Sequence, residues 1–299
     1  MRPLALLVAG LLVFSIPTNA VGVAINSEVG LTPSKGQWIV RSQIRYTKKA
    51  DDPISQDREW EIFALPQTFV YGFTENASLI VTVPFLNKEL DSTSGGARTS
   101  RKDAGLGDVL LLGKYRMYVQ DYPMATSRLS ALAGIDLPTG QSGDADAQGK
   151  LPRDLQLGSG SADPVVGAAY TWQSLDDEWD ISLTHQFNTT ANKFEFGDVL
   201  AYTVAYQRRV WPRRLPERGL YAQWNLVLEA NGQWEQKAKD HGRRVDNTGG
   251  HLLFLSPGFQ VATKHLVLET SIQLPVLQNL NGNQVEPDFV LVGSFRVTF

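Results

Sequence analysis

The last eleven residues of this 299-residue chain, from Phe289 to Phe299, alternate between two kinds of side chain. Odd-numbered positions are apolar or glycine and include Phe295, whereas even-numbered positions become polar and include Arg296. A period of two predicts a β-strand. A transmembrane barrel explains an apolar stripe that reaches the carboxyl terminus, because lipid covers one face and the closing strand pairs with the first. The alternative for these residues alone is the C-terminal strand of a soluble sandwich.

The aromatic ending is typical of the signal by which bacterial outer-membrane barrels are recognised for assembly. We interpret Phe295 and Phe299 as the residues of this assembly signal. The sequence therefore predicts two partners: outer-membrane lipid and, during biogenesis, the barrel-assembly machinery.

The N-terminus predicts export. Met1 and Arg2 precede an almost wholly apolar run from Leu4 to Ile16, and small residues follow up to Ala20. This run is too short for a membrane-spanning helix and is typical of a secretory signal peptide. We expect residues 1–20 to be the signal peptide and residues 21–299 to form one barrel domain.

Composition removes several classes of function. The chain has no cysteine, so disulfides, thiolate chemistry and cysteine-based zinc sites are excluded. The formal net charge of −3 gives no indication of nucleic-acid binding. No pair of histidines has metal-ligand spacing, and we expect no cofactor and no metal.

Stretches with two-residue alternation, long enough to cross a bilayer as tilted strands, recur along the mature chain. They predict an all-β fold, a transmembrane antiparallel β-barrel of about twelve strands. The predicted strands lie near residues 37–47, 59–72, 76–86, 106–119, 127–138, 163–173, 178–188, 197–209, 218–233, 250–262, 265–276 and 288–299.

The connections between these strands fall into two groups. Those after even-numbered strands are mostly short, and those after odd-numbered strands are mostly long and polar. The long ones include Asn87–Gly105, Thr139–Ala162 and Gly232–Gly250. This sorting is typical of a barrel in the outer membrane of a Gram-negative bacterium, with both termini on the periplasmic side. Whether a loop or the segment from Val21 to Gly36 plugs the lumen is left open by the sequence.

An aspartate opens four of the strands predicted to run inward from the long loops. In three of them an aromatic residue follows seven residues later, an odd spacing that puts the two residues on opposite faces, and the fourth strand is a looser copy. These aspartates are Asp108, Asp163, Asp198 and Asp288. If the aromatic residues face lipid, the aspartates face the lumen. The alternative is that aspartate simply follows turn-forming glycine and serine.

Alternation assigns the charged residues of the strands to the lumen, because charge on the lipid face costs about 2–4 kcal/mol at mid-membrane. Acidic groups gather toward the outer mouth and basic groups toward the periplasm. One hypothesis is a pore whose acidic vestibule attracts cationic or polar solutes, and the alternative is an ion-pair network that fills a narrow barrel. The predicted pore-lining residues are Arg41, Arg45, Asp108, Lys114, Arg116, Arg128, Asp136, Asp163, Asp198, Arg208, Glu229, Glu269, Asp288 and Arg296.

Two strands resist this assignment. The strands near residues 59–72 and 197–209 have large apolar side chains in both phases, so their register stays open. Pro66 lies in the first of them and predicts a bulge there.

Catalytic residues are not expected. His185 is the one enzymatic candidate, because some outer-membrane lipases keep a histidine and a serine on the lipid side. No nucleophile motif accompanies it, so an interfacial histidine is the simpler interpretation.

Five stretches together resemble the outer-membrane family named for the MetA pathway of phenol degradation. They are "VYGFTENASLIVTVPF", "GLGDVLLLGKYRMY", "GIDLPTG", "LGSGSADPVVGAAY" and the terminal strand, and they span most of the mature chain. The resemblance implies passage of hydrophobic or aromatic compounds across the outer membrane, and it brings no catalytic residues. We expect an outer-membrane channel or transporter for a small-molecule solute. The alternatives are a lipid hydrolase and a non-conducting structural or partner-binding barrel.

Overall fold

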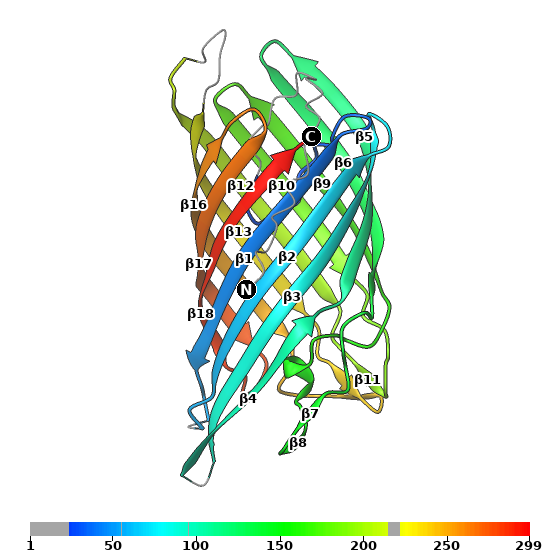
Figure 1. The fold of residues 1–299 in the computed structure, drawn as a ribbon, viewed down its shortest axis with the longest axis vertical. Coiled ribbons are helices and arrows are strands. Elements are labelled where there is room, and N and C mark those ends of the chain that lie inside the picture. Colours follow the sequence, from blue (N-terminus) through cyan, green and yellow to red (C-terminus); the bar gives the residue numbers. More distant parts are fainter. Residues whose placement is uncertain (1–23, 55, 95, 215–221) are drawn as a thin grey trace, which may run out of the picture.

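The computed structural model describes residues 24–54, 56–94, 96–214 and 222–299, so the predicted signal peptide lies outside the described residues. Within these ranges, twelve antiparallel strands form one closed and strongly tilted barrel (Figure 1). The predicted fold class is therefore confirmed. The strands are β1 (Trp38–Asp51), β2 (Glu59–Gly72), β3 (Ala77–Ser94), β5 (Val109–Tyr122), β6 (Ala125–Leu137), β9 (Asp163–Ser174), β10 (Asp177–Gln186), β12 (Val199–Trp211), β13 (Gln223–Glu235), β16 (Gly250–Ala262), β17 (Leu266–Leu280) and β18 (Glu286–Thr298).

The terminal strand closes the barrel, as its sequence predicts. β1 pairs with β2 on one side and with β18 on the other, and the register places Arg41 opposite Arg296. The Phe299 backbone N–H donates to the Trp38 carbonyl at 2.9 Å, and Trp38 N–H donates to the Phe299 carbonyl at 3.2 Å. The seam therefore continues to the carboxyl terminus, and neither strand is left with an open edge.

The usual burial pattern of a soluble protein is inverted. Buried side chains of the wall strands are largely polar or charged, and Glu229 and Gln260 have 0% exposure. Large apolar side chains are exposed around the outside. They include Ile44, Ile181, Leu183, Leu226, Leu268 and Leu291. An exposed apolar belt around a polar interior is the arrangement that a lipid bilayer requires of a barrel.

Aromatic side chains gather at the end of the barrel with the short turns. Trp38 lies 4.7 Å from Tyr71 between ring centroids, and Trp211 lies 5.7 Å from Trp224. Such rings prefer the level of lipid headgroups, because one edge is apolar and the other can form hydrogen bonds. They mark the membrane boundary at the short-turn end. No helix among the described residues is long and apolar enough to cross a membrane.

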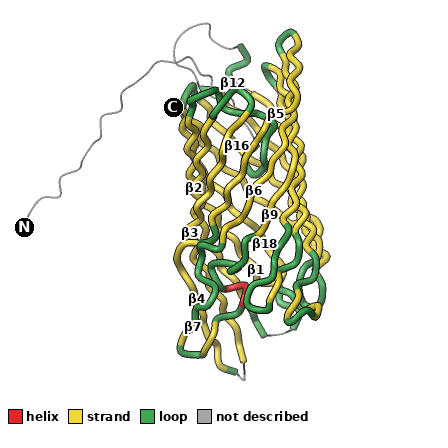
Figure 2. The backbone as a smooth tube through the Cα atoms, turned by 90° about the vertical axis from the view of Figure 1, so that its right-hand side faces the viewer, coloured by secondary structure: helices red, strands yellow, loops and turns green. Residues whose placement is uncertain are grey.

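The long connections gather at the opposite end, which we call the long-loop end (Figure 2). The segment Asn87–Gly105, predicted as a loop, is instead a hairpin in which β3 continues and pairs with β4 (Ala97–Leu106). Polar residues on both faces hide this hairpin from a membrane-strand pattern. The other loops contain β7 (Ala145–Asp146), β8 (Gly149–Lys150), the 3₁₀ turn η1 (Arg153–Leu155), β11 (Phe194–Glu195), β14 (Lys239–Asp240) and β15 (Arg243–Arg244).

The bulge predicted at Pro66 is wrong. The β2–β3 register is continuous, with Pro66 opposite Pro84, and the β1–β2 register is the same before and after a gap near Gln43. Proline lacks an N–H, so the ladder loses hydrogen bonds here, but no residue is inserted.

Candidate functional site

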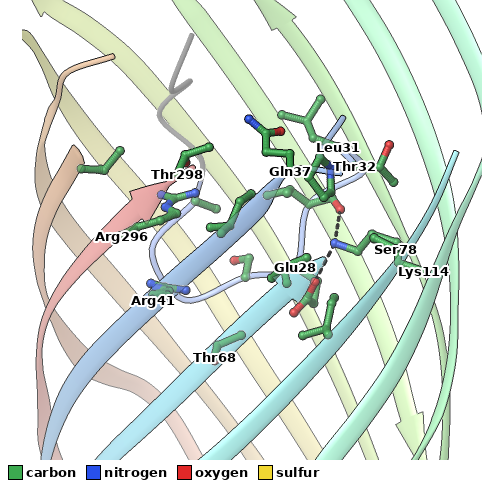
Figure 3. A pocket seen from close by; sticks show the side chains of 18 residues that line it. Glu28, Leu31, Thr32, Gln37, Arg41, Thr68, Ser78, Lys114, Arg296 and Thr298 are labelled. Atoms are coloured by element: carbon green, nitrogen blue, oxygen red, sulfur yellow. Dashed lines mark hydrogen bonds and ion pairs between the residues drawn. The ribbon is translucent and has the colours of Figure 1, made fainter. Parts of the chain in front are cut away.

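The N-terminal segment fills the lumen. Residues 24–32, which we call the N-terminal plug, leave the start of β1 and lie between the wall strands (Figure 3). Ala24 is 1% exposed and Ile25 is 0% exposed, and Ile25 belongs to a cluster with Val227, Val290 and Val292 on the inner wall. The question that the sequence leaves open is thus answered: a segment before the first strand occupies the barrel interior.

Glu229 on β13 holds the tip of the plug. Its carboxylate accepts hydrogen bonds from the backbone N–H of Ile25 at 2.5 Å and of Asn26 at 3.1 Å. It also accepts the Ser27 hydroxyl at 2.9 Å. A carboxylate that satisfies consecutive backbone N–H groups makes charge-assisted hydrogen bonds, which are stronger than neutral ones. The predicted lumen residue Glu229 is therefore the anchor of the plug tip.

Lys114 on β5 holds the next part of the plug. Its ammonium donates to the Glu28 carboxylate and to the Val29 carbonyl, both at 2.9 Å (Figure 3). The Lys114 side chain is 6% exposed and the Glu28 side chain is 36% exposed, so the cation of this pair is buried while the anion keeps contact with water. The Arg41 guanidinium donates to the Ile25 carbonyl. Cations of the wall thus bind plug carbonyls, and an anion of the wall binds plug N–H groups.

Gly30 of the plug packs directly against the backbone of the wall. Its N–H donates to the Thr171 hydroxyl at 2.9 Å, and its carbonyl accepts the Ser130 hydroxyl at 2.7 Å. A Cβ added at Gly30 would lie 2.5 Å from the Arg128 carbonyl oxygen and 2.9 Å from the Thr171 backbone nitrogen. Because both neighbours are backbone atoms of paired strands, only glycine fits here.

A larger side chain at position 30 should therefore displace the plug. We expect Gly30→Val to leave the barrel folded, because the wall strands do not depend on the plug for their ladders, and to expose the N-terminal segment. Limited proteolysis followed by N-terminal sequencing should show much faster cleavage before β1 than in the parent protein. Gly293→Val is the matched control, since Gly293 lies on the wall strand β18 and a Cβ there meets no atom within 4 Å. Equal protection of the Gly30→Val plug would contradict this docking geometry.

A buried ion cluster lies beside the plug. Glu269 on β17 has a fully buried side chain and pairs with Arg41 at 2.5 Å and with Arg296 at 3.2 Å. Gln260 donates to Glu269 at 2.9 Å, and the Ser294 hydroxyl donates to it at 2.5 Å. This is the ion-pair network that the sequence offered as the alternative to a polarised pore. Two further acidic side chains, Glu178 and Asp180, are buried on β10.

A cavity of about 210 Å³ remains beside the plug at the short-turn end. Arg41, Lys114 and Arg296 line it together with the plug residue Glu28, and apolar side chains form much of the remaining surface (Figure 3). The cavity lies between the plug and the part of the wall formed by β17, β18, β1, β2, β3 and β5.

A larger cavity of about 550 Å³ opens at the long-loop end. It is lined by wall residues at the outer ends of the strands and by the loops that fold over the mouth. Its basic lining residues are Lys49, Arg58, Lys88 and Arg153, and its acidic lining residues are Asp154 and Glu235. This cavity does not form the acidic vestibule of the polarised-pore hypothesis, because its lining includes none of Asp108, Asp136, Asp163, Asp198 and Asp288.

Two of these aspartates instead bind loop backbone. Asp108 accepts the Gly140 N–H at 2.8 Å and the Ser159 N–H at 2.7 Å, and Asp163 accepts the Thr189 N–H at 2.7 Å. They fold the loops over the mouth, which agrees with the alternative that aspartate serves turns.

Asp136 on β6 lies at the same level of the rim. The register places it opposite Leu110 on β5 and opposite Asp163 on β9. Asp198, just before β12, accepts the Asn188 N–H at 2.9 Å and so also binds a loop at the rim.

Two predicted lumen residues lie elsewhere. Arg208 is on the outer face near the short-turn end, with a side chain that is 58% exposed and paired with Asp177 at 2.8 Å. Neighbouring Arg209 takes the inward position and pairs with Asp176, because large side chains in both phases of β12 concealed its register. Asp288 is exposed because the β1–β18 register shifts between Lys48 and Lys49, which inserts one residue into β18.

Of the remaining predicted residues, three occupy inward positions on their strands. Arg45 is half-buried and donates to Gln273 at 3.3 Å. Arg116 donates to the Asn76 side chain in the β2–β3 turn at 2.7 Å, and Arg128 pairs with Asp121 at 3.2 Å. The assembly-signal residues Phe295 and Phe299 are both exposed on the outside of the barrel.

His185 does not complete a catalytic group in the part of the chain that the structure describes. It stacks on Phe187 at 4.3 Å between ring centroids, and its Nε2 atom is buried without a described hydrogen-bond partner. No cluster of three or more histidine and carboxylate side chains suited to a metal ion occurs among the described residues.

The residues that sequence analysis missed fall into two groups. Glu28, Gly30, Ser130 and Thr171 join the plug to the wall across long sequence separations, and no local pattern marks them. Glu178 alternates with Trp179 and Asp180 with Ile181, so the period of two could have assigned these acids to the lumen.

Comparison with known proteins supports the fold and no more. No family model matches the chain, and no curated protein matches it. Among solved structures, the COG4313 outer membrane channel from Pseudomonas putida F1 is similar with a TM-score of 0.66 and 15% identity, covering 92% of this chain and 100% of that chain. The β domain of the Bordetella autotransporter BrkA gives a TM-score of 0.43 at 12% identity, covering 89% and 100% of the two chains. The chain therefore has the fold of outer-membrane β-barrels.

Proposed function

We propose that this protein is a passive outer-membrane channel for small hydrophobic or aromatic molecules, held closed at rest by its N-terminal plug. The observation that carries the proposal is the lumen itself, in which a cavity of about 550 Å³ at the long-loop end and one of about 210 Å³ at the short-turn end lie within one barrel. The plug that lines the inner cavity is held by hydrogen bonds to wall side chains and is not part of the strand ladders.

Two further observations support a channel. The similar structure from Pseudomonas putida F1 is named as an outer membrane channel. The resemblance to the MetA-pathway family of phenol degradation points to hydrophobic or aromatic solutes. The cavity at the long-loop end offers apolar contacts to such solutes through Trp60, Ile62, Phe194 and Phe196.

The mature barrel, residues 21–299 after removal of residues 1–20, would lie in the outer membrane of a Gram-negative bacterium. Vesicle flux tests the function directly. Purified protein in lipid vesicles should accelerate the entry of benzyl alcohol or phenol, and the acceleration should increase when the plug is loosened. Absence of flux for every solute, with the plug in place and with the plug removed, would leave a non-conducting structural barrel, the candidate that the extensive plug contacts favour.

The exposed terminal aromatic residues carry a prediction on biogenesis. Phe299 is 55% exposed at the rim, where it makes backbone contacts to Trp38 but buries little side-chain surface. We expect Phe299→Ser to reduce the amount of assembled barrel in cells severalfold, because the assembly machinery would no longer recognise the terminus. Stability of the refolded protein should change by less than about 1 kcal/mol, since the substitution is at the surface.

Heat-modifiable migration on gels measures the assembled fraction, and refolding into detergent measures stability. Phe73→Ser, which changes an exposed aromatic residue at the same end of the barrel, is the control. Equal assembly of the two variants would show that the terminal phenylalanine is not a recognition signal.

A further inference from the structure

The cavity at the long-loop end contains an ammonium group that makes no direct ion pair with a described residue. Lys49 points inward from β1 and lines this cavity, yet it has no hydrogen bond or ion pair to any residue within the described ranges. Its sequence neighbour Lys48 points outward and pairs with Glu59 at 2.7 Å. A lysine that is kept inside the barrel mouth without a partner is costly unless a ligand supplies the counter-charge.

A second ammonium lies on the same stretch of wall. Lys88 on β3 donates to the backbone carbonyls of Asp154 at 2.9 Å and of Gln156 at 2.6 Å, so its direct partners carry no net charge. Among the described residues, no carboxylate oxygen lies within ion-pair distance of Lys49 or Lys88. The two cations therefore remain available to an anion.

An apolar strip separates these cations. β2 lies between β1 and β3, and the register places Trp60 opposite Lys49 and Ile62 opposite Lys88. Both side chains line the cavity, and Phe194 and Phe196 from the loop after β10 line it as well. The Arg153 guanidinium lies 5.0 Å above the centre of the Phe194 ring, which fixes that ring by a cation–π contact.

The acidic lining residues do not cancel this arrangement. Asp154 and Glu235 line the cavity against four basic residues, of which Arg58 is already paired with Asp52 at 2.6 Å. The net charge of the lining residues is therefore still positive. The cavity volume of about 550 Å³ lies within the ~300–1,000 Å³ range of ordinary small-molecule sites.

We infer that this cavity is a binding site for an aromatic carboxylate, whose anionic group lies between Lys49 and Lys88 and whose ring packs on Trp60, Ile62 and the Phe194–Phe196 pair. The inference rests on the proposed channel function, because a solute that crosses the barrel must first bind at this mouth. It narrows the solute class from aromatic molecules in general to aromatic anions.

Equilibrium binding to the purified full-length mature protein in detergent tests this site. The probes are benzoate, the neutral benzyl alcohol and the cationic benzylamine, measured by titration calorimetry. Benzoate should bind more tightly than the other two. Lys49→Gln should weaken benzoate binding about tenfold, which is the loss of roughly one charge-assisted hydrogen bond, and should leave benzyl alcohol unchanged.

Lys48→Gln is the matched control, since it removes the same charge one residue away on the outer face. Benzoate binding no tighter than that of benzyl alcohol, tighter binding of benzylamine, or equal weakening by Lys48→Gln and Lys49→Gln would each overturn the inference. Binding is measured with the plug in place, so it is separable from passage. Benzoate binding without vesicle flux of any solute would reject the channel, and flux without selective benzoate binding would reject the site.

Discussion

Deleting the plug, residues 24–32, should convert a closed barrel into a conducting one. These residues occupy the lumen and are bound by Glu229, Lys114, Ser130 and Thr171, whereas the strand ladders that close the wall do not include them. The deletion removes the plug and leaves a lumen lined by polar and charged side chains, which water and ions can enter. Planar-bilayer recordings should show long-lived conductance steps for the deletion variant and rare or no steps for the parent protein.

A point variant separates the effect of releasing the plug from the effect of shortening the chain. Glu229→Gln keeps the shape of the anchor but removes its charge, which weakens charge-assisted hydrogen bonds by about 1.5–3 kcal/mol in total. At 1.4 kcal/mol for each factor of ten, the open fraction should increase by roughly ten- to a hundredfold. Glu178→Gln is the matched control, because Glu178 is also buried in the lumen and its described hydrogen-bond partners, Gln173 and Asp180, are wall residues.

The two recordings together decide the role of the segment. Conductance in the deletion variant and in Glu229→Gln, but not in Glu178→Gln, would establish the plug as the closed gate. A deletion variant that stays silent would show that the loops over the long-loop end, rather than the N-terminal segment, block passage.

Sequence alternation predicted the wall well because membrane strands obey a simple physical rule. β2 and β16 begin and end at the predicted residues, and the predicted lumen positions Arg41, Lys114, Glu229 and Glu269 all face inward. Each of these strands has lipid on one side and a polar lumen on the other, so one period determines both faces.

The wrong assignments arise where a strand does not have lipid on one side and a polar lumen on the other, or where its register is irregular. Asp288 changes face because β18 contains one inserted residue, and Arg208 lies on a strand with large side chains in both phases. The β3–β4 hairpin is polar on both faces, because both of its faces lie in water. A periodic pattern cannot predict how the plug docks. The backbone N–H of Ile25 binds the Glu229 side chain, which is 204 residues away in the sequence.

Replacing Glu269 by alanine should cause the largest loss of stability of any single change in the wall. Its side chain is fully buried and neutralises both Arg41 and Arg296, whose own side chains are 22% and 12% exposed. Without the carboxylate, two guanidinium groups face each other in a partly dehydrated lumen. Breaking a buried ion pair in this way costs about 3–5 kcal/mol. Urea unfolding in lipid vesicles should show a correspondingly lower midpoint with little change in the slope.

An ion pair at the surface is the control that shows how much of this stability loss comes from burial of the charges. Glu89→Ala removes a carboxylate that is 38% exposed and 3.6 Å from Lys102 on the β3–β4 hairpin, and it should cost less than about 1 kcal/mol. Removing all three charges with Arg41→Met, Glu269→Leu and Arg296→Met should recover much of the loss, because no charge is then left unpaired in the wall. If Glu269→Ala and Glu89→Ala were equally mild, water in the lumen would be screening the cluster, and the interior around Glu269 would be an aqueous path and not a packed core.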